Sequence, residues 1–223
     1  MICNDSDRNI NESVNKKVGF RQNGMTLLEV IIVLGIMGVI AAGVVVLAQR
    51  AMDNQNVSKL SQSLNVIQTA MVQTYRSQKS YPALTSDADS EKLISALTSM
   101  GKITASDSVN PFTGQALKVL TLADNKAANR GFVIKVENLS QNQCKAMVSN
   151  SADLFSFIQI ETAGGALVTD MYTDPNAATP TGVIKSTKGG PGQYNVTNLD
   201  HVTALCGSDA GSSAYYDVFF GNR

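Results

Sequence analysis

The sequence GMTLLEVIIVLGIMGVIAAGVVVLAQR, residues 24–50, decides how this chain is organised. It contains one acidic residue, Glu29, and then no charge before Arg50. A helix needs ~20 mostly apolar residues to cross a bilayer, and this stretch supplies them. A small residue, Gly24, precedes the apolar run, whereas the cleavage site of an ordinary secretory signal follows it. Cleavage at Gly24 would therefore keep the hydrophobic segment on the mature chain.

The residues upstream of this segment, 1–23, are polar and carry a cluster of cations at Lys16, Lys17 and Arg21. Cations beside a membrane helix tend to stay in the cytoplasm. The sequence therefore predicts that the N-terminus stays inside and that the C-terminal part of the chain is exported.

The three cysteines are Cys3, Cys144 and Cys206. If Cys3 leaves with the leader, an even pair remains in a domain that is exported to an oxidising compartment, where cysteine pairs form disulfides. This argument favours a disulfide, and two unrelated buried thiols are the alternative.

The helix is predicted to continue well beyond the apolar segment. No Pro occurs before Pro82, and apolar residues recur in steps of three and four at Val57, Leu60, Leu64, Ile67 and Met71. This pattern predicts one helix from about Met25 to about Gln78, apolar all round in its first half and amphipathic in its second. We expect a globular domain to pack on the amphipathic face, with a free coiled coil as the alternative.

Small residues are frequent in the apolar segment, and two of them, Gly38 and Ala42, lie four positions apart. In lipid, such spacing lets the backbones of two helices approach closely. The spacing favours a helix that packs against copies of itself, and an ordinary lone anchor is the alternative.

The rest of the chain alternates between short helices and strands. Helices are predicted at 87–100, at 141–149 with Ser140 as its N-cap, and at 198–205 with Asn198 as its N-cap. Strands are predicted at 116–122, 131–137, 155–161, 183–185 and 214–220. Residues 164–192 are rich in Gly, Pro and Thr and are predicted to form long surface loops around the short strand at 183–185. The predicted fold is α+β, with an antiparallel sheet packed on the amphipathic half of the long helix. The pattern does not predict the order of the strands.

The sequence offers little evidence for an enzyme. No phosphate loop, CxxC pair, HExxH or GxSxG motif occurs, and the only histidine, His201 beside Asp200, lacks a nucleophile at a suitable spacing. Lys plus Arg number 18 and Asp plus Glu number 18, so bulk charge does not point to nucleic acid as a partner. We therefore expect no catalytic site, no metal and no cofactor.

The informative ionisable residue is Glu29, because a carboxylate at the edge of an apolar helix is costly unless it is paired. If the chain is cut after Gly24, Met25 gains a free α-amino group that must also be satisfied in or near lipid. The two charges can neutralise each other within one helix or between neighbouring helices. A carboxylate that lies in the lipid headgroup region is the alternative.

At these residues the chain resembles a known family. Residues 24–81 look like the start of a type IV pilin of the type IVb branch, in which Met is the first mature residue, and are similar to longus-type pilins and toxin-coregulated pilus subunits. Looser matches extend the resemblance through NPFTG at 110–114, QCK at 143–145, GVIKS at 182–186 and NLDHVTALC at 198–206.

The resemblance implies specific roles for the residues that match the family's motifs. A prepilin peptidase would cut between Gly24 and Met25 and methylate the new amine of Met25. Glu29 would pair with that amine on a neighbouring subunit during assembly, and Cys144 would form a disulfide with Cys206. The implied parts are a leader at 1–24, a transmembrane and assembly helix at 25–52 and a globular pilin domain at 53–223.

The function implied is that of a major structural subunit of a type IVb pilus, a helical homopolymer used for adhesion and bacterial aggregation. The precursor would lie in the bacterial inner membrane, meet the prepilin peptidase and the pilus assembly machinery, and end in an extracellular filament that can touch host cells. One alternative is a minor pilin or secretion-system pseudopilin. A second alternative, from another class, is a membrane-anchored periplasmic enzyme or binding protein.

Overall fold

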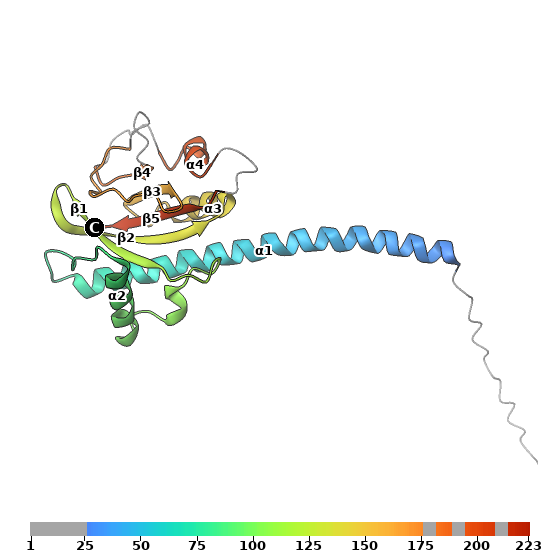
Figure 1. Cartoon of the computed structure of the whole chain (residues 1–223), viewed down its shortest axis with the longest axis horizontal. Coiled ribbons are helices and arrows are strands. Elements are labelled where there is room, and N and C mark those ends of the chain that lie inside the picture. The colour runs from blue at the N-terminus through green and yellow to red at the C-terminus, as the bar shows by residue number, and fades with distance from the viewer. Residues whose placement is uncertain (1–25, 176–181, 189–194, 208–213) are drawn as a thin grey trace, which may run out of the picture. The chain divides into compact units, whose positions relative to one another are not determined.

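The long N-terminal helix predicted from the sequence is α1, Leu27–Tyr75 (Figure 1). The computed structural model describes residues 26–175, 182–188, 195–207 and 214–223, so Gly24 and Met25 lie outside the described residues. The chain forms two compact units, 1–46 and 47–223. In the first unit, the described residues contain only the beginning of α1.

In the second unit, the face of α1 that the sequence pattern marked is buried. Its inward side chains at Leu60, Leu64, Ile67 and Met71 have no exposed surface. They belong to a core shared with the sheet and with three short helices, α2 (Asp87–Ser99), α3 (Gln141–Ser151) and α4 (Leu199–Leu205). The amphipathic half of the helix therefore packs on a globular domain, as predicted.

Within the described residues, the sheet has five strands in the order β1-β2-β5-β3-β4, and every neighbouring pair is antiparallel. The strands are β1 (Lys118–Asp124), β2 (Ala127–Leu139), β3 (Phe157–Thr162), β4 (Val183–Lys185) and β5 (Tyr216–Asn222). The last strand of the chain thus lies in the middle of the sheet, between β2 and β3 (Figure 1).

Most predicted elements are present with shifted ends, and the largest shift is in β2, predicted to begin at 131. Asn125 and Lys126 both adopt positive φ, +51° and +66°, and form a tight turn that lets β2 begin at Ala127. Two-residue hairpin turns with positive φ match the natural twist of the strands. A short 3₁₀ helix at Ala105–Ser108 was not predicted.

The caps of the short helices agree with the residues that predict them. Asn198 accepts a hydrogen bond from the backbone N–H of Asp200 at the start of α4 (3.0 Å). The side chain of Gln143 accepts one from the backbone N–H of Ser140 at the start of α3 (2.9 Å). Backbone N–H groups at the start of a helix have no acceptor within the helix, and these side chains supply one.

A second apolar core lies on the face of the sheet that points away from α1. It consists of one buried side chain from each of the five strands and one loop residue: Leu122, Val133, Phe157, Met171, Val183 and Phe219. The prediction of surface loops for 164–192 is therefore wrong at Met171, which has no exposed surface. Gly221 makes room for it, because a Cβ there would lie 2.9 Å from the Met171 methyl. Residues 176–181 and 189–192 lie outside the described residues.

A network of ion pairs also lies on this face of the sheet. Lys135 contacts Glu137 at 2.6 Å and the buried Asp217 at 3.1 Å, and Lys118 contacts Glu137 at 2.8 Å. Burial opposes the charge of Lys135, but its hydrogen bonds to Glu137 and Asp217 outweigh this and raise its pKa. Asp217 also accepts the backbone N–H of Gly164 (3.0 Å), so this network fastens the loop after β3 to the sheet.

Asp170 fastens the same loop to the β1–β2 turn. Its carboxylate accepts backbone hydrogen bonds from Asn125 (3.0 Å), Lys126 (2.8 Å) and Tyr172 (2.9 Å). Partial burial opposes the charged form, but these three bonds outweigh it and lower the pKa of Asp170. The charged form is therefore the one that the fold prefers.

We expect Asp170→Asn to destabilise the domain by about 1–2 kcal/mol near neutral pH, because hydrogen bonds to a charge are stronger than those to an amide. A carboxylate whose pKa is lowered by folding stabilises the fold above its unfolded pKa, about 3.9, and that contribution disappears as pH falls through the folded value. The difference in melting temperature between the two proteins should therefore shrink below about pH 4. Thermal unfolding followed by circular dichroism measures it, with Asp153→Asn as an exposed control. A difference that stays constant down to pH 3 would contradict the assignment.

Candidate assembly surface

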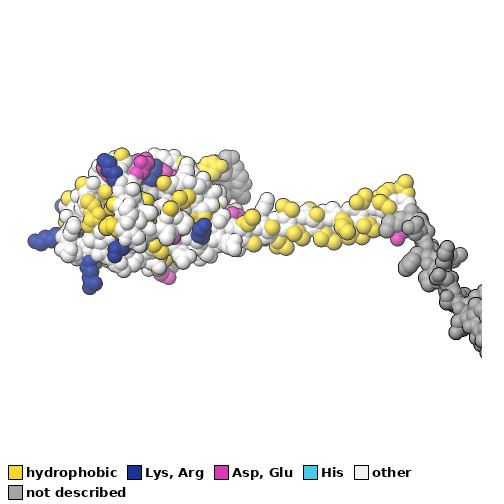
Figure 2. Space-filling model, turned by 90° about the horizontal axis from the view of Figure 1, so that it is seen from below, with side chains coloured by type: hydrophobic (Ala, Val, Ile, Leu, Met, Phe, Trp, Pro, Cys, Tyr) yellow, Lys and Arg dark blue, Asp and Glu magenta, His cyan; other side chains and the backbone are white. Residues whose placement is uncertain are grey.

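The first half of α1 presents an uncovered apolar surface. Every residue from 26 to 55 is exposed, and hydrophobic side chains lie along this part of the helix (Figure 2). Their exposed fractions run from 40% at Val30 to 78% at Leu27. The large ones are Leu27, Leu28, Val30, Ile31, Ile32, Val33, Leu34, Ile36, Met37, Val39, Ile40, Val44, Val45, Val46, Leu47 and Met52. A soluble monomer rarely exposes so large an apolar patch, so this surface needs lipid or protein against it.

The length of the apolar segment matches a bilayer. From Leu27 to Val46 the helix spans roughly 30 Å at about 1.5 Å per residue, which equals the hydrocarbon thickness of a typical membrane. Within the described ranges, α1 is the one helix that is long and apolar enough to cross a membrane.

Glu29 lies in the first turn of α1, and the hydroxyl of Thr26 accepts the Glu29 backbone N–H (3.3 Å). A carboxylate in the first turn interacts favourably with the positive end of the helix dipole. Among the described residues, no cation forms an ion pair with its carboxylate. The structure thus leaves the charge of Glu29 open to a partner, and the proposed partner, the amine of Met25, lies outside the described residues.

The small residues of the segment leave its surface open. At Gly35, Gly38 and Gly43, an added Cβ would meet no atom of another element within 4 Å. Each glycine costs a helix roughly 0.5–1 kcal/mol relative to Ala, so the local helix gains nothing from them. Close approach of a second helix is the benefit that such positions offer in lipid.

Cys144 in α3 and Cys206 at the end of α4 are joined by a disulfide across a sequence separation of 62. Both sulfurs are fully buried in the main core. Gly207 follows with φ +88°, and its carbonyl accepts a hydrogen bond from the side chain of Gln141 at the start of α3. The bond that the resemblance implied is therefore present, and it holds α4 against α3.

The histidine considered as a possible base has a structural contact. His201 Nδ1 accepts the backbone N–H of Asn195 (2.9 Å) and so shapes the chain just before α4. This contact uses the ring nitrogen that a general base would need for a substrate proton.

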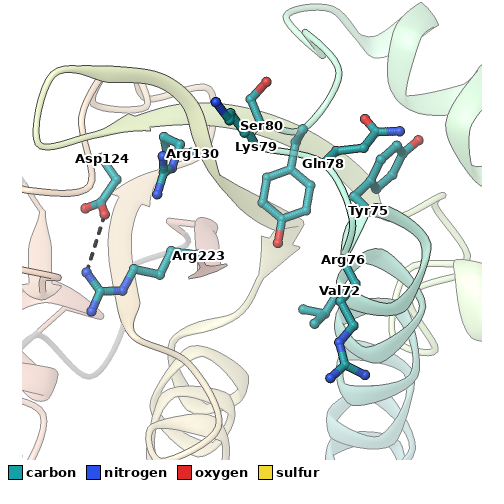
Figure 3. A pocket seen from close by; sticks show the side chains of 10 residues that line it. Val72, Tyr75, Arg76, Gln78, Lys79, Ser80, Asp124, Arg130 and Arg223 are labelled. Carbon is teal, nitrogen blue, oxygen red and sulfur yellow. Dashed lines mark ion pairs between the residues drawn. The ribbon is translucent and has the colours of Figure 1, made fainter.

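A basic cleft lies at the C-terminal end of α1, and the sequence did not predict it. Its volume is about 420 Å³, and Figure 3 shows Arg130, Arg223 and Asp124 on one side of it and Tyr75 and Arg76 on the other. Arg76 and Lys79 are recognisable as cations that follow a helix end. Arg130 and Arg223 come from β2 and from the residue after β5, so only the strand order brings them to the same place.

Comparison with known proteins agrees with this arrangement. Residues 96–221 match the family model described as toxin-coregulated pilus subunit TcpA, and residues 19–45 match the prokaryotic N-terminal methylation motif. The second match covers the predicted cleavage site and the start of the apolar helix.

Individual relatives cover nearly the whole chain. The toxin coregulated pilin of Vibrio cholerae serotype O1 is 46% identical over 217 residues, which are 96% of this chain and 94% of that protein. A second toxin coregulated pilin of Vibrio cholerae is 44% identical over the same shares of both chains. Among solved structures, the crystal structure of TcpA, a type IV pilin from the Vibrio cholerae El Tor biotype, is 39% identical, with a TM-score of 0.65 over 76% of this chain and 99% of that one. The chain therefore belongs to the family of toxin-coregulated pilus subunits and is a type IVb pilin.

Proposed function

We propose that this chain is the major structural subunit of a type IVb pilus and that it acts by polymerising through its first helix. The observation that carries the proposal is the apolar surface of residues 26–55, which no described part of the chain covers. As a pilin with a methylation motif and an apolar N-terminal helix, it is anchored in the membrane as a precursor and later forms part of an extracellular pilus.

Processing would divide the chain into three parts with different roles. A prepilin peptidase would remove residues 1–24 by cutting between Gly24 and Met25, and would methylate the amine of Met25. Residues 25–52 would then serve as the membrane and assembly helix, and residues 53–223 as the globular domain. The methylation motif at residues 19–45 supports this order of events.

Assembly would exchange lipid for other copies of α1. Lipid and a bundle of apolar helices are equally apolar, so this exchange has little hydrophobic driving force, and close packing and polar pairing decide its free energy. The open glycine positions favour close packing, and the carboxylate of Glu29, which pairs with no cation among the described residues, favours pairing with the amine of Met25 on a neighbour. A repeated contact between two different faces grows into a helical filament when its rotation does not close into a ring.

The alternative of a minor pilin or pseudopilin is less well supported. Minor pilins at a filament tip often lack the glutamate that this chain carries at Glu29. The relatives at 46% and 44% identity are pilins of the toxin-coregulated pilus, and the match extends over nearly the whole chain. Adhesion to host cells and bacterial aggregation are the uses that we propose for the filament.

We expect electron microscopy to show filaments on cells that make this chain and none on cells from which it is deleted. Mass spectrometry of sheared filaments should give a mature chain that begins at a methylated Met25, because the peptidase retains the apolar helix. Restoring the chain from a plasmid is the control for the deletion. Unchanged filaments in the deletion strain would refute the role of major subunit, and residues before Met25 in the filaments would refute the processing step.

A further inference from the structure

The basic cleft at the end of α1 has more cations than carboxylates. Its lining includes four cationic side chains, Arg76, Lys79, Arg130 and Arg223, and one acidic side chain, Asp124. Asp124 pairs with Arg223 (3.5 Å) and also accepts the hydroxyl of Thr187 (2.5 Å). The other three cations form no ion pair within the described part of the chain. The whole chain has a formal net charge of zero, so this excess is local.

The helix dipole explains only part of this cluster. Cations just beyond the C-terminus of a helix interact favourably with its negative end, and this accounts for Arg76 and Lys79 after Tyr75. It does not account for Arg130, which lies in β2, or for Arg223, which follows β5. The convergence of cations from three separate elements points to an anionic ligand.

Aromatic rings give the cleft a rigid apolar side. Tyr75 and Tyr81 both line it, with ring centroids 5.8 Å apart in an edge-to-face arrangement. Tyr81 also lies against the buried ring of Phe132, with centroids 5.0 Å apart, so the core holds its position. A volume of about 420 Å³ lined by arginines and tyrosines suits one or two sugar rings that carry an acidic group.

The acidic groups of a second copy fit the cleft less well. The most acidic helix of the described chain is α2, with Asp87, Asp89 and Glu91. Asp87 already pairs with Lys118 (2.7 Å), and Asp89 accepts the hydroxyl of Ser86 (2.6 Å). Two of the three carboxylates therefore have partners within their own chain.

We propose that this cleft binds an anionic polysaccharide and that Arg76, Lys79 and Arg130 hold its sulfate or carboxylate groups. Guanidinium groups form paired hydrogen bonds with such groups. The three cations are exposed, so solvent and salt screen each contact and a single site binds weakly. Repetition along a filament compensates for weak single sites when the ligand is itself a polymer. In this respect the proposal rests on the proposed function.

The experiment measures the binding of purified filaments to immobilised heparin, with dextran as the neutral control surface. Arg76→Gln combined with Arg130→Gln is expected to weaken binding about tenfold or more, because the loss at each site is multiplied along the filament. The matched control removes two exposed cations outside the cleft, Lys92→Gln with Lys102→Gln, and should change binding less than about twofold. Unchanged melting temperatures would show that both double variants fold.

Several other results of the heparin experiment would contradict the proposal. Equal losses in the two double variants would overturn the proposal in favour of non-specific attraction, and so would a lack of binding by the unmodified filaments. If the Arg76→Gln, Arg130→Gln variant makes no filaments, the cleft is a contact between subunits and the proposal fails. Soluble dextran sulfate and soluble polygalacturonate serve as competitors. Competition by the first assigns the site to sulfate groups and competition by the second to carboxylate groups. If neither polymer competes, the proposal is overturned.

A failure of the assembly proposal can be separated from a failure of the cleft. If the unmodified chain makes no filaments, the detergent-solubilised full chain is immobilised at high density and tested against heparin. Weaker binding by the Arg76→Gln, Arg130→Gln variant would then still support the cleft, and equal binding would overturn it.

Discussion

Glu29→Ala is expected to abolish filaments while leaving the subunit folded in the membrane. Glu29 is exposed in the first turn of α1 and is not a member of the buried core, so the substitution removes no core side chain. In the assembled state, however, the amine of Met25 on the neighbouring subunit would lose its counter-charge. Breaking a buried ion pair by removing one partner costs roughly 3–5 kcal/mol.

A free-energy cost of this size should prevent filament growth, because every added subunit incurs it. Each 1.4 kcal/mol changes an equilibrium constant about tenfold, so the subunit concentration needed for growth would rise by more than about 100-fold. Electron microscopy counts the filaments, and immunoblots of the membrane fraction check that the subunit is present in normal amounts. Asp53→Ala, which removes an exposed carboxylate from the same helix beyond the apolar segment, is the matched control and should leave filaments. Normal filaments with Glu29→Ala would show that the carboxylate has no role in assembly.

Replacing both Cys144 and Cys206 with Ala is expected to produce the largest loss of stability in the globular domain. On the chain-entropy account, a disulfide that closes a loop with a separation of 62 stabilises the fold by about 4 kcal/mol. For a chain of this size, each kcal/mol corresponds to about 2–4 °C, so the melting temperature should fall by roughly 8–16 °C. Alanine leaves no unpaired polar group at these fully buried positions.

Reduction of the unmodified protein provides the matched comparison. A thiol reductant should lower its melting temperature by a similar amount and should leave the double alanine variant unchanged. Calorimetry of the full chain in detergent measures both effects. A fall of less than about 2 °C in the variant would show that the packing of α3 and α4, and not the crosslink, holds this region together.

The sequence by itself determined the features that arise from local pattern. The apolar run up to Arg50 predicted a membrane-length helix, and the spacing of Leu60, Leu64, Ile67 and Met71 predicted its buried face. Caps such as Asn198 marked helix ends, because one side chain and the next turn suffice to make them. The family followed from the residues around Gly24 and Glu29, whose offsets are local too.

The tertiary structure decided everything that depends on which distant segments meet. The central place of β5 follows from pairings between residues far apart in the chain, which alternation within one strand does not encode. The burial of Met171 depends on the space above Gly221, and the basic cleft depends on β2 and β5 carrying Arg130 and Arg223 to the end of α1. A periodic pattern specifies which face of an element is buried. The strand order specifies what lies against that face, because it results from the free energy of the whole packed domain.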